Sequence, residues 1–334
     1  MRWSTTYLFV LVILGVAEAH GQSERKPTSA PPIPSASSEL LFRPVEERTP
    51  TRIRTEQAEG PAWNDATPFE SALDNFSLFA GLEASRQPQD LGVNANFGGN
   101  LSANIGMPLL EDLGLGLQAG IGLNLSKAGV RVLRVAEGTR SRVQWFGTIG
   151  VFERADSWYA GIAYDHQESS YYSQIQAGQI RSEVGFDVSP DDVVGAWGAV
   201  AVAGTDVSIL AADLRIRPMN QLSIFWNHRW ESGAETRFWL GVAGQHGTDI
   251  ISLPDRNLTD PVAVFGLQVF VPLNNHFAMF GQGNFVTPSD TGTLDAYLGL
   301  AYFFGGTQES RTNRFAPVLP VANNPTMPLD LRRR

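Results

Sequence analysis

The chain has 334 residues, a formal net charge of -9 and no cysteine. The lack of cysteine excludes disulfide staples, thiolate metal sites, cysteine nucleophiles and acylation of a lipoprotein cysteine. The acidic balance provides no general basic face for nucleic acid, so no nucleic-acid partner is predicted.

Residues 1–19 have the features of a secretory signal peptide. A charged start at Arg2 precedes an apolar run from Tyr7 to Ala17, and Ala17-Glu18-Ala19 resembles a cleavage site. The apolar run is too short for a retained membrane anchor, which needs roughly 20 residues. The sequence therefore predicts export with cleavage after Ala19. Residues 20–72 are rich in proline and show no sustained period, which predicts a disordered leader.

Residues 93–125 alternate apolar residues with small polar ones, and this period of two predicts strands. Each of the two runs exceeds the roughly ten residues with which a tilted strand crosses a bilayer. The polar face carries Asn, Gln, Ser and Gly, which suits a wet or tightly packed lumen. The apolar positions are Val93, Ala95, Phe97, Leu101, Ala103, Ile105, Met107, Leu113, Leu115, Leu117, Ala119, Ile121, Leu123 and Leu125.

Residues 73–306 form one all-β domain with thirteen strand candidates separated by turn signals. A closed bacterial barrel whose two termini lie on the same side of the membrane needs an even number of strands. One of the thirteen candidates is therefore wrong or split. We place this error between Val193 and Arg217. The predicted fold is a single antiparallel up-and-down transmembrane β-barrel of about twelve strands. Residues 307–334 are again rich in proline and end in three arginines, which predicts a disordered basic tail.

Charged residues of both signs occupy the predicted lumen face in the middle of the domain. Because an isolated buried charge is costly, these residues are expected to pair. They are interpreted either as the wall of a water-filled path, which would tune permeation, or as a salt-bridged plug that fills the barrel. The predicted lumen-lining residues are Asp165, Arg181, Glu183, Asp187, Asp213, Arg215, Arg229, Glu231 and Arg237.

The last strand candidate, residues 297–304, begins at Tyr297 and ends at Phe304. A polar residue, a glycine two positions later and alternating hydrophobic residues ending in an aromatic resemble the insertion signal of outer-membrane barrels. With the signal peptide, the leader and the all-β domain, the chain resembles a bacterial, porin-like outer-membrane β-barrel over residues 73–304. Its leader and tail resemble those of an uncharacterised planctomycete family. The resemblance implies an outer-membrane location, with membrane lipid and the barrel-insertion machinery as partners, and it transfers no functional residues.

No catalytic residue, metal site or cofactor is predicted. Asp165 and His166 are adjacent on a strand and so lie on opposite faces, while His228 and His246 lack a spaced set of further ligands. The predicted function is non-enzymatic, either a porin-like passive channel or a structural envelope protein. The alternative is a secreted, soluble all-β protein that binds a cell-envelope polymer.

Overall fold

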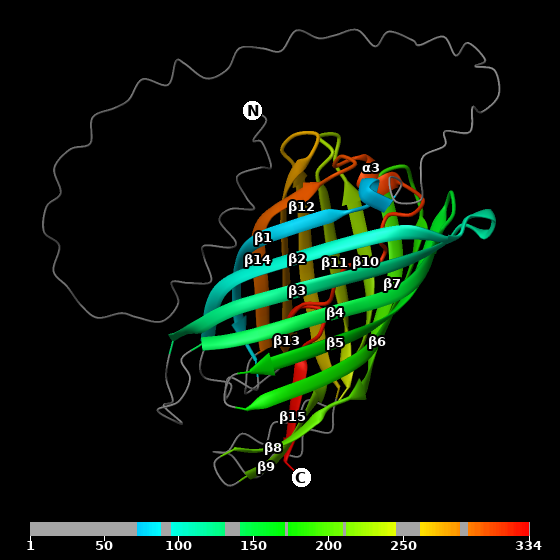
Figure 1. The fold of residues 1–334 in the computed structure, drawn as a ribbon. Coiled ribbons are helices and arrows are strands. Elements are labelled where there is room, and N and C mark those ends of the chain that lie inside the picture. Colours follow the sequence, from blue (N-terminus) through cyan, green and yellow to red (C-terminus); the bar gives the residue numbers. More distant parts are fainter. Residues whose placement is uncertain are drawn as a thin grey trace, which may run out of the picture. The chain divides into compact units, whose positions relative to one another are not determined.

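The computed structural model describes residues 72–87, 95–130, 141–170, 173–209, 212–244, 261–287 and 293–333. The predicted signal peptide and nearly all of the predicted leader lie outside these residues. Twelve antiparallel strands close into a barrel in the order β1-β14-β13-β12-β11-β10-β7-β6-β5-β4-β3-β2 (Figure 1). They are β1 (Ser77–Arg86), β2 (Ala95–Leu110), β3 (Leu115–Val130), β4 (Ser141–Arg154), β5 (Trp158–Ser170), β6 (Gln174–Asp187), β7 (Asp192–Ala203), β10 (Asn220–Arg229), β11 (Glu235–Gly244), β12 (Val262–Pro272), β13 (Phe277–Thr287) and β14 (Thr293–Phe303).

The twelve-stranded barrel confirms the predicted fold class. The surplus candidate, near Ser208, falls in the stretch that was expected to hold the error. It belongs to a hairpin of β8 (Thr205–Ile209) and β9 (Ala212–Pro218), which pair with each other outside the barrel sheet. β7 instead pairs directly with β10, so the hairpin is an insertion between two neighbouring barrel strands.

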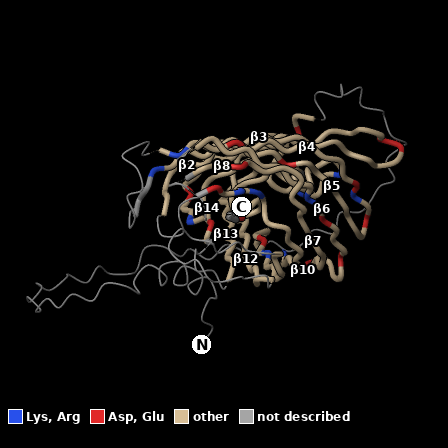
Figure 2. The backbone as a smooth tube through the Cα atoms, turned by 90° about the horizontal axis from the view of Figure 1, so that it is seen from below, with Lys and Arg blue, Asp and Glu red and all other residues tan. Residues whose placement is uncertain are grey.

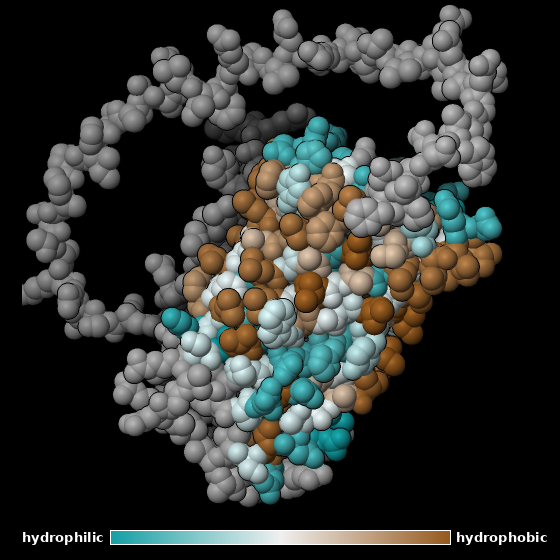
Figure 3. Space-filling model, viewed as in Figure 1, coloured by the Kyte–Doolittle hydropathy of each residue, from teal (hydrophilic) through white to brown (hydrophobic). Residues whose placement is uncertain are grey.

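The barrel wall has no open edge, because β1 pairs with both β2 and β14. Every second side chain of the strands faces outward, and these side chains are mostly apolar. Leu82, Ile224 and Leu240 are 58%, 68% and 60% exposed. Hydrophobic residues cover much of the visible wall, and hydrophilic ones gather toward its ends (Figure 3). A closed ladder with an apolar exterior is what lipid requires of a strand-built protein.

Among the described residues, no helix is long and apolar enough to cross a membrane.

The two ends of the barrel differ in their connections. One end, here called the short-turn end, holds brief links between consecutive strands, and β1 begins and β14 ends there. The opposite end, here called the hairpin end, carries the β8–β9 hairpin. The links at the short-turn end are residues 111–114, 155–157, 188–191, 230–234 and 273–276.

The prediction of a disordered tail is wrong for residues 307–333. After β14 the chain turns at Gly306 (φ 104°), forms the short helix α3 (Glu309–Thr312), passes through the barrel and ends in β15 (Leu329–Arg333). β15 pairs with β9 and completes a three-stranded sheet with β8. We call residues 313–328 the lumen segment. Composition misleads here because an extended, proline-rich segment looks the same in sequence whether water or a barrel wall satisfies its main chain.

Candidate functional site

The lumen segment binds the barrel wall largely through its main chain, and four of its N–H groups donate hydrogen bonds to wall side chains. Side chains of three neighbouring strands, β2, β3 and β4, accept these hydrogen bonds. Because buried N–H groups need partners, this pairing permits an irregular chain to cross the interior. The pairs are Gln118 with the N–H groups of Val318 (3.0 Å) and Leu319 (3.1 Å), Asn104 with that of Val321 (2.6 Å), and Thr148 with that of Ala322 (2.9 Å).

Carbonyl groups of the same segment accept hydrogen bonds from longer wall side chains. Arg154 donates to Ala316 O at 3.0 Å, and Arg181 donates to Pro320 O at 2.6 Å. Gln179 also donates to the carbonyl of Thr326, at 3.1 Å. Residues 317 and 320 are prolines, which have no main-chain N–H that would need a partner. Every main-chain N–H from residue 317 to residue 322 therefore has a partner on the wall.

Glycines on the lumen face bring the segment close to the wall. A Cβ added at Gly120 would lie 2.7 Å from Val321 Cβ, and one at Gly106 would clash with the carbonyl oxygen of Phe315. Any side chain at these positions would displace the segment. The small residues seen in the alternating sequence thus form a groove for a chain rather than a wet lumen.

At the middle of the barrel the segment contacts both sides of the wall. Asn323 donates to the Tyr297 hydroxyl on β14 at 3.0 Å, while Arg181 on β6 holds Pro320. β14 and β6 lie opposite each other in the ring of twelve strands. A gap of about 50 Å³ lies beside Trp197 and Trp239, which is room for a few water molecules.

Toward the hairpin end the lumen segment also packs into an apolar core. Inward-facing residues of β4 and β6 meet the β8–β9 hairpin and the end of the lumen segment. Each of these side chains is buried. The lumen segment is therefore held by polar contacts at the middle of the barrel and by this apolar core nearer the hairpin end. The core residues are Phe146, Ile175, Ala177, Leu214, Ile216, Val321, Ala322, Met327 and Leu329.

Four charged residues inside the barrel form two ion pairs. Arg181 lies 2.9 Å from Asp165, which also accepts a hydrogen bond from Thr148 at 2.6 Å. Arg237 donates two hydrogen bonds of 2.8 Å to Glu183. This two-point geometry is the strong form of an ion pair, and it satisfies charges that would otherwise be costly to bury.

The structure brings four of the predicted lumen residues, Asp165, Arg181, Glu183 and Arg237, together inside the barrel. Two others lie at the short-turn end. Asp187 is exposed at the mouth, and Arg229 lies 3.3 Å from Glu235.

Three predicted positions are wrong. Asp213 and Arg215 belong to β9, and Arg215 is 55% exposed beside Asp206 at 3.9 Å. They were misplaced because the inserted hairpin alternates just as a barrel strand does. Glu231 is exposed in the turn that follows β10, so it lies beyond the end of the wall strand.

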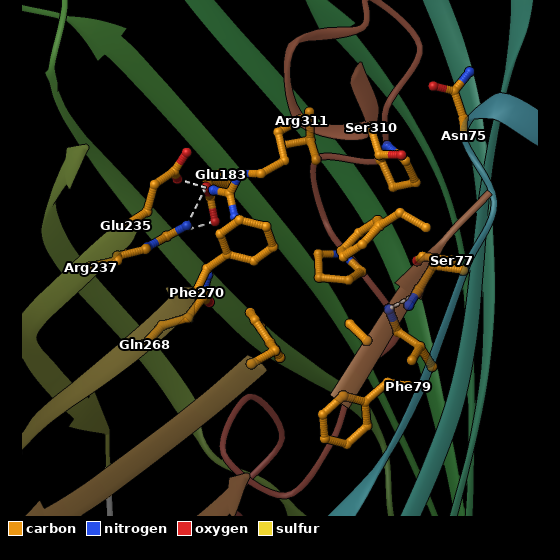
Figure 4. Close-up of a pocket in the computed structure, with 18 of the residues that line it drawn as sticks. Asn75, Ser77, Phe79, Glu183, Glu235, Arg237, Gln268, Phe270, Ser310 and Arg311 are labelled. Carbon is orange, nitrogen blue, oxygen red and sulfur yellow. Dashed lines mark hydrogen bonds and ion pairs between the residues drawn. The ribbon is translucent and has the colours of Figure 1, made fainter. Parts of the chain in front are cut away.

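A cavity of about 880 Å³ opens toward the short-turn end, and we call it the vestibule (Figure 4). Ser77, Asn100 and Phe79 line one side, and the Glu183–Arg237 pair lies on the other. The vestibule is thus lined by charged side chains of both signs, by aromatic rings and by uncharged polar side chains.

Helix α3 contributes one charged group to the vestibule. The Arg311 guanidinium pairs with Glu235 and lies 4.1 Å from the centre of the Phe270 ring. Burial lowers the pKa of Arg311 to about 9, with the positive charges of Arg229 and Arg154 as smaller causes. Arg311 is therefore still charged at neutral pH, and Glu235 is its ion-pair partner.

Several of these residues were not predicted from the sequence. Glu83 and Arg142 form a buried ion pair at 3.2 Å. Both lie on the polar face of their strands, so the alternation of apolar and polar residues could have identified them. Gln118 carries the same signal. Arg311 carried no such signal, because apolar and polar residues do not alternate in the part of the chain where it lies.

Within the described ranges, no three His, Cys, Asp or Glu side chains are placed to hold a metal ion. Asp165 is fully buried and His166 is exposed on the opposite face. His228 lies at the short-turn end, 2.8 Å from Asp192. His246 lies outside the described residues.

The family described as "Family of unknown function (DUF6666)" matches residues 75–329. The chain belongs to this family. The match runs from just before β1 to the first residue of β15, so it includes the lumen segment as well as the barrel. The predicted likeness to planctomycete members stays a prediction. No curated protein matches the chain significantly.

Solved structures of outer-membrane barrels are similar at low identity. NanC porin has a TM-score of 0.42 and 9% identity, covering 67% of this chain and 98% of that chain. KdgM porin has a TM-score of 0.39 and 8% identity, covering 67% and 98%. Outer membrane phospholipase A from Escherichia coli has a TM-score of 0.39 and 10% identity, covering 68% and 95%.

Proposed function

We propose that the protein is a non-enzymatic outer-membrane β-barrel that is closed in its folded state and serves as a structural component of the envelope. The observation that carries this proposal is the lumen segment, which contacts opposite sides of the wall at the middle of the barrel. The apolar exterior and the short turns at one end support an outer-membrane location.

Displacing the lumen segment would be unfavourable on two counts. Val318, Leu319 and Met327 would lose a buried apolar environment, and Gln118 and Arg181 would lose main-chain partners. Porins that conduct freely keep an aqueous lumen. An interior filled in this way supports a permanently occupied barrel over an open porin.

The second candidate is a passive channel in which the lumen segment acts as the barrier. The vestibule favours it, because about 880 Å³ of polar space lies directly behind the short-turn mouth. Paired charges such as Glu183 and Arg237 would then influence which solutes enter. Solute would cross only while the segment is displaced.

Conductance in a planar lipid bilayer separates the two candidates. The full chain is expected to show no stable open-channel steps, and a variant lacking residues 313–334 is expected to conduct. A variant lacking only residues 333–334 is the matched control, because it keeps the lumen segment. Each protein is first tested for heat-dependent migration on a denaturing gel, which reports a closed barrel.

Steady conductance by the full chain would contradict the structural proposal and favour the channel. A closed truncated barrel that does not conduct would show that the lumen segment is not the barrier. Recovery of the mature chain in the soluble fraction would overturn both membrane functions and favour the secreted, polymer-binding alternative.

A further inference from the structure

The lumen segment runs in one direction from the short-turn end to the hairpin end. Its contacts with β4 follow that order: Arg154, the last residue of β4, holds Ala316, and Gln144, ten positions earlier, holds Asn324. In Figure 1, α3 and β15 lie at opposite ends of the barrel. Viewed from the hairpin end, the barrel strands form a ring around the interior (Figure 2).

We propose that the barrel passes its own chain through its lumen across the membrane and presents β15 on the outer face of the cell. The assignment of sides rests on the proposed outer-membrane location. Barrels of that membrane have short periplasmic turns and longer outer loops, so the short-turn end faces the periplasm. β14 ends on that side, and the lumen segment then makes one further crossing.

The β8–β9 hairpin receives the emerging chain. β15 pairs with β9 from Leu329 opposite Pro218 to Arg333 opposite Leu214, and Met219 donates its N–H to Pro328 O at 2.9 Å. The sheet edge that β9 offers is filled by β15, the strand that follows the lumen segment. The hairpin therefore acts as a latch that keeps the C-terminal strand at the outer end.

Side chains strengthen the latch on one face of the small sheet. Leu329 and Met327 are buried against Leu214 and Ile216. On the other face, Asp206 and Arg215 are about half exposed. The sheet thus has an apolar inner face and a polar outer face, which suits a short sheet that closes the barrel and faces water.

The absence of cysteine from the chain permits a direct test with single-cysteine reporters. One variant carries a cysteine appended after Arg334. The second, Asp206→Cys, reports the hairpin end, and the third, Asp156→Cys, reports the exposed turn between β4 and β5 at the short-turn end. Intact cells are treated with a membrane-impermeant maleimide, before and after the outer membrane is permeabilised.

The appended cysteine and Asp206→Cys are expected to label on intact cells, at least ten times more strongly than Asp156→Cys. All three are expected to label after permeabilisation. Protection of the appended cysteine while Asp206→Cys labels would overturn the proposal, because the C-terminus would then remain on the periplasmic side. Labelling of Asp156→Cys alone would also overturn it.

Failure of the proposed function has a different signature. If the protein does not span a membrane, it is recovered in the soluble fraction and the three reporters show no difference between the two ends. Heat-dependent migration on a denaturing gel is measured for each variant, so that only closed barrels enter the comparison. The two substitutions and the appended cysteine lie outside the barrel wall and are expected to leave that migration unchanged.

Discussion

Gln118 on β3 and Leu319 in the lumen segment are joined at both polar groups of the Leu319 main chain. The Gln118 side chain accepts from the N–H of Leu319 and donates to its carbonyl, across 201 positions of sequence. One wall amide thus pairs with the segment much as a neighbouring strand would. Because this contact recognises the main chain, the sequence of the segment carries little trace of it.

Replacing Gln118 with alanine is expected to lower the free energy of unfolding. The change removes the partners of two buried N–H groups and one carbonyl, and each orphaned group costs about 1–3 kcal/mol. Leu117→Ala, on the outward face of the same strand, is the control. Urea titration in detergent micelles measures both. Equal midpoints for the two variants would mean that the wall does not hold the segment through Gln118.

A larger side chain at Gly120 is expected to push the lumen segment aside. A Cβ there already comes within 2.7 Å of Val321, so Gly120→Val should increase proteolysis of the segment or bilayer conductance. Gly147→Val is the matched control, since a Cβ at Gly147 meets no atom within 4 Å. If both variants behave like the parent chain, the segment does not lie in this groove.

The barrel wall could be predicted because each strand has two unlike environments. Leu101 faces outward and Asn100 is buried inside, so the period of two appears directly in the sequence. The same logic located Asp165 and Arg181 on the inner face. It failed for Asp213 on β9, because a strand of an inserted hairpin also has one apolar and one polar face. Sequence alternation does not state which sheet a strand joins.

The lumen segment was missed for a different reason. Its two sides contact β2 to β4 on one hand and β6 and β14 on the other, so no repeating apolar face develops. Pro317 and Pro320 look like loop residues, yet the carbonyl groups of both accept hydrogen bonds from arginines of the wall. Arg311 was missed together with the segment that follows it. Its ion-pair partner Glu235 could then not be recognised as part of the site.

An arginine on the outer face is expected to be far more costly than one in the vestibule. Ile121 is 54% exposed near the middle of β3, where a charge at the bilayer midplane costs about 2–4 kcal/mol. Ser102, on the neighbouring strand β2, lines the vestibule. Ser102→Arg should therefore insert normally while Ile121→Arg loses stability. The yield of heat-modifiable protein in lipid vesicles measures the difference, and equal yields would contradict a lipid-facing exterior.

Removing the carboxylate of Asp165 is expected to be among the most damaging single changes. Asp165→Asn leaves the buried Arg181 guanidinium without its charged partner, a kind of change that costs about 3–5 kcal/mol. The double variant Asp165→Asn, Arg181→Met removes both charges and should recover part of this loss. Asp156→Asn, in an exposed turn, is the control and should be neutral. Unfolding midpoints in detergent measure all three. A single variant as stable as the control would mean that water reaches Arg181, which would favour a hydrated channel over a filled lumen.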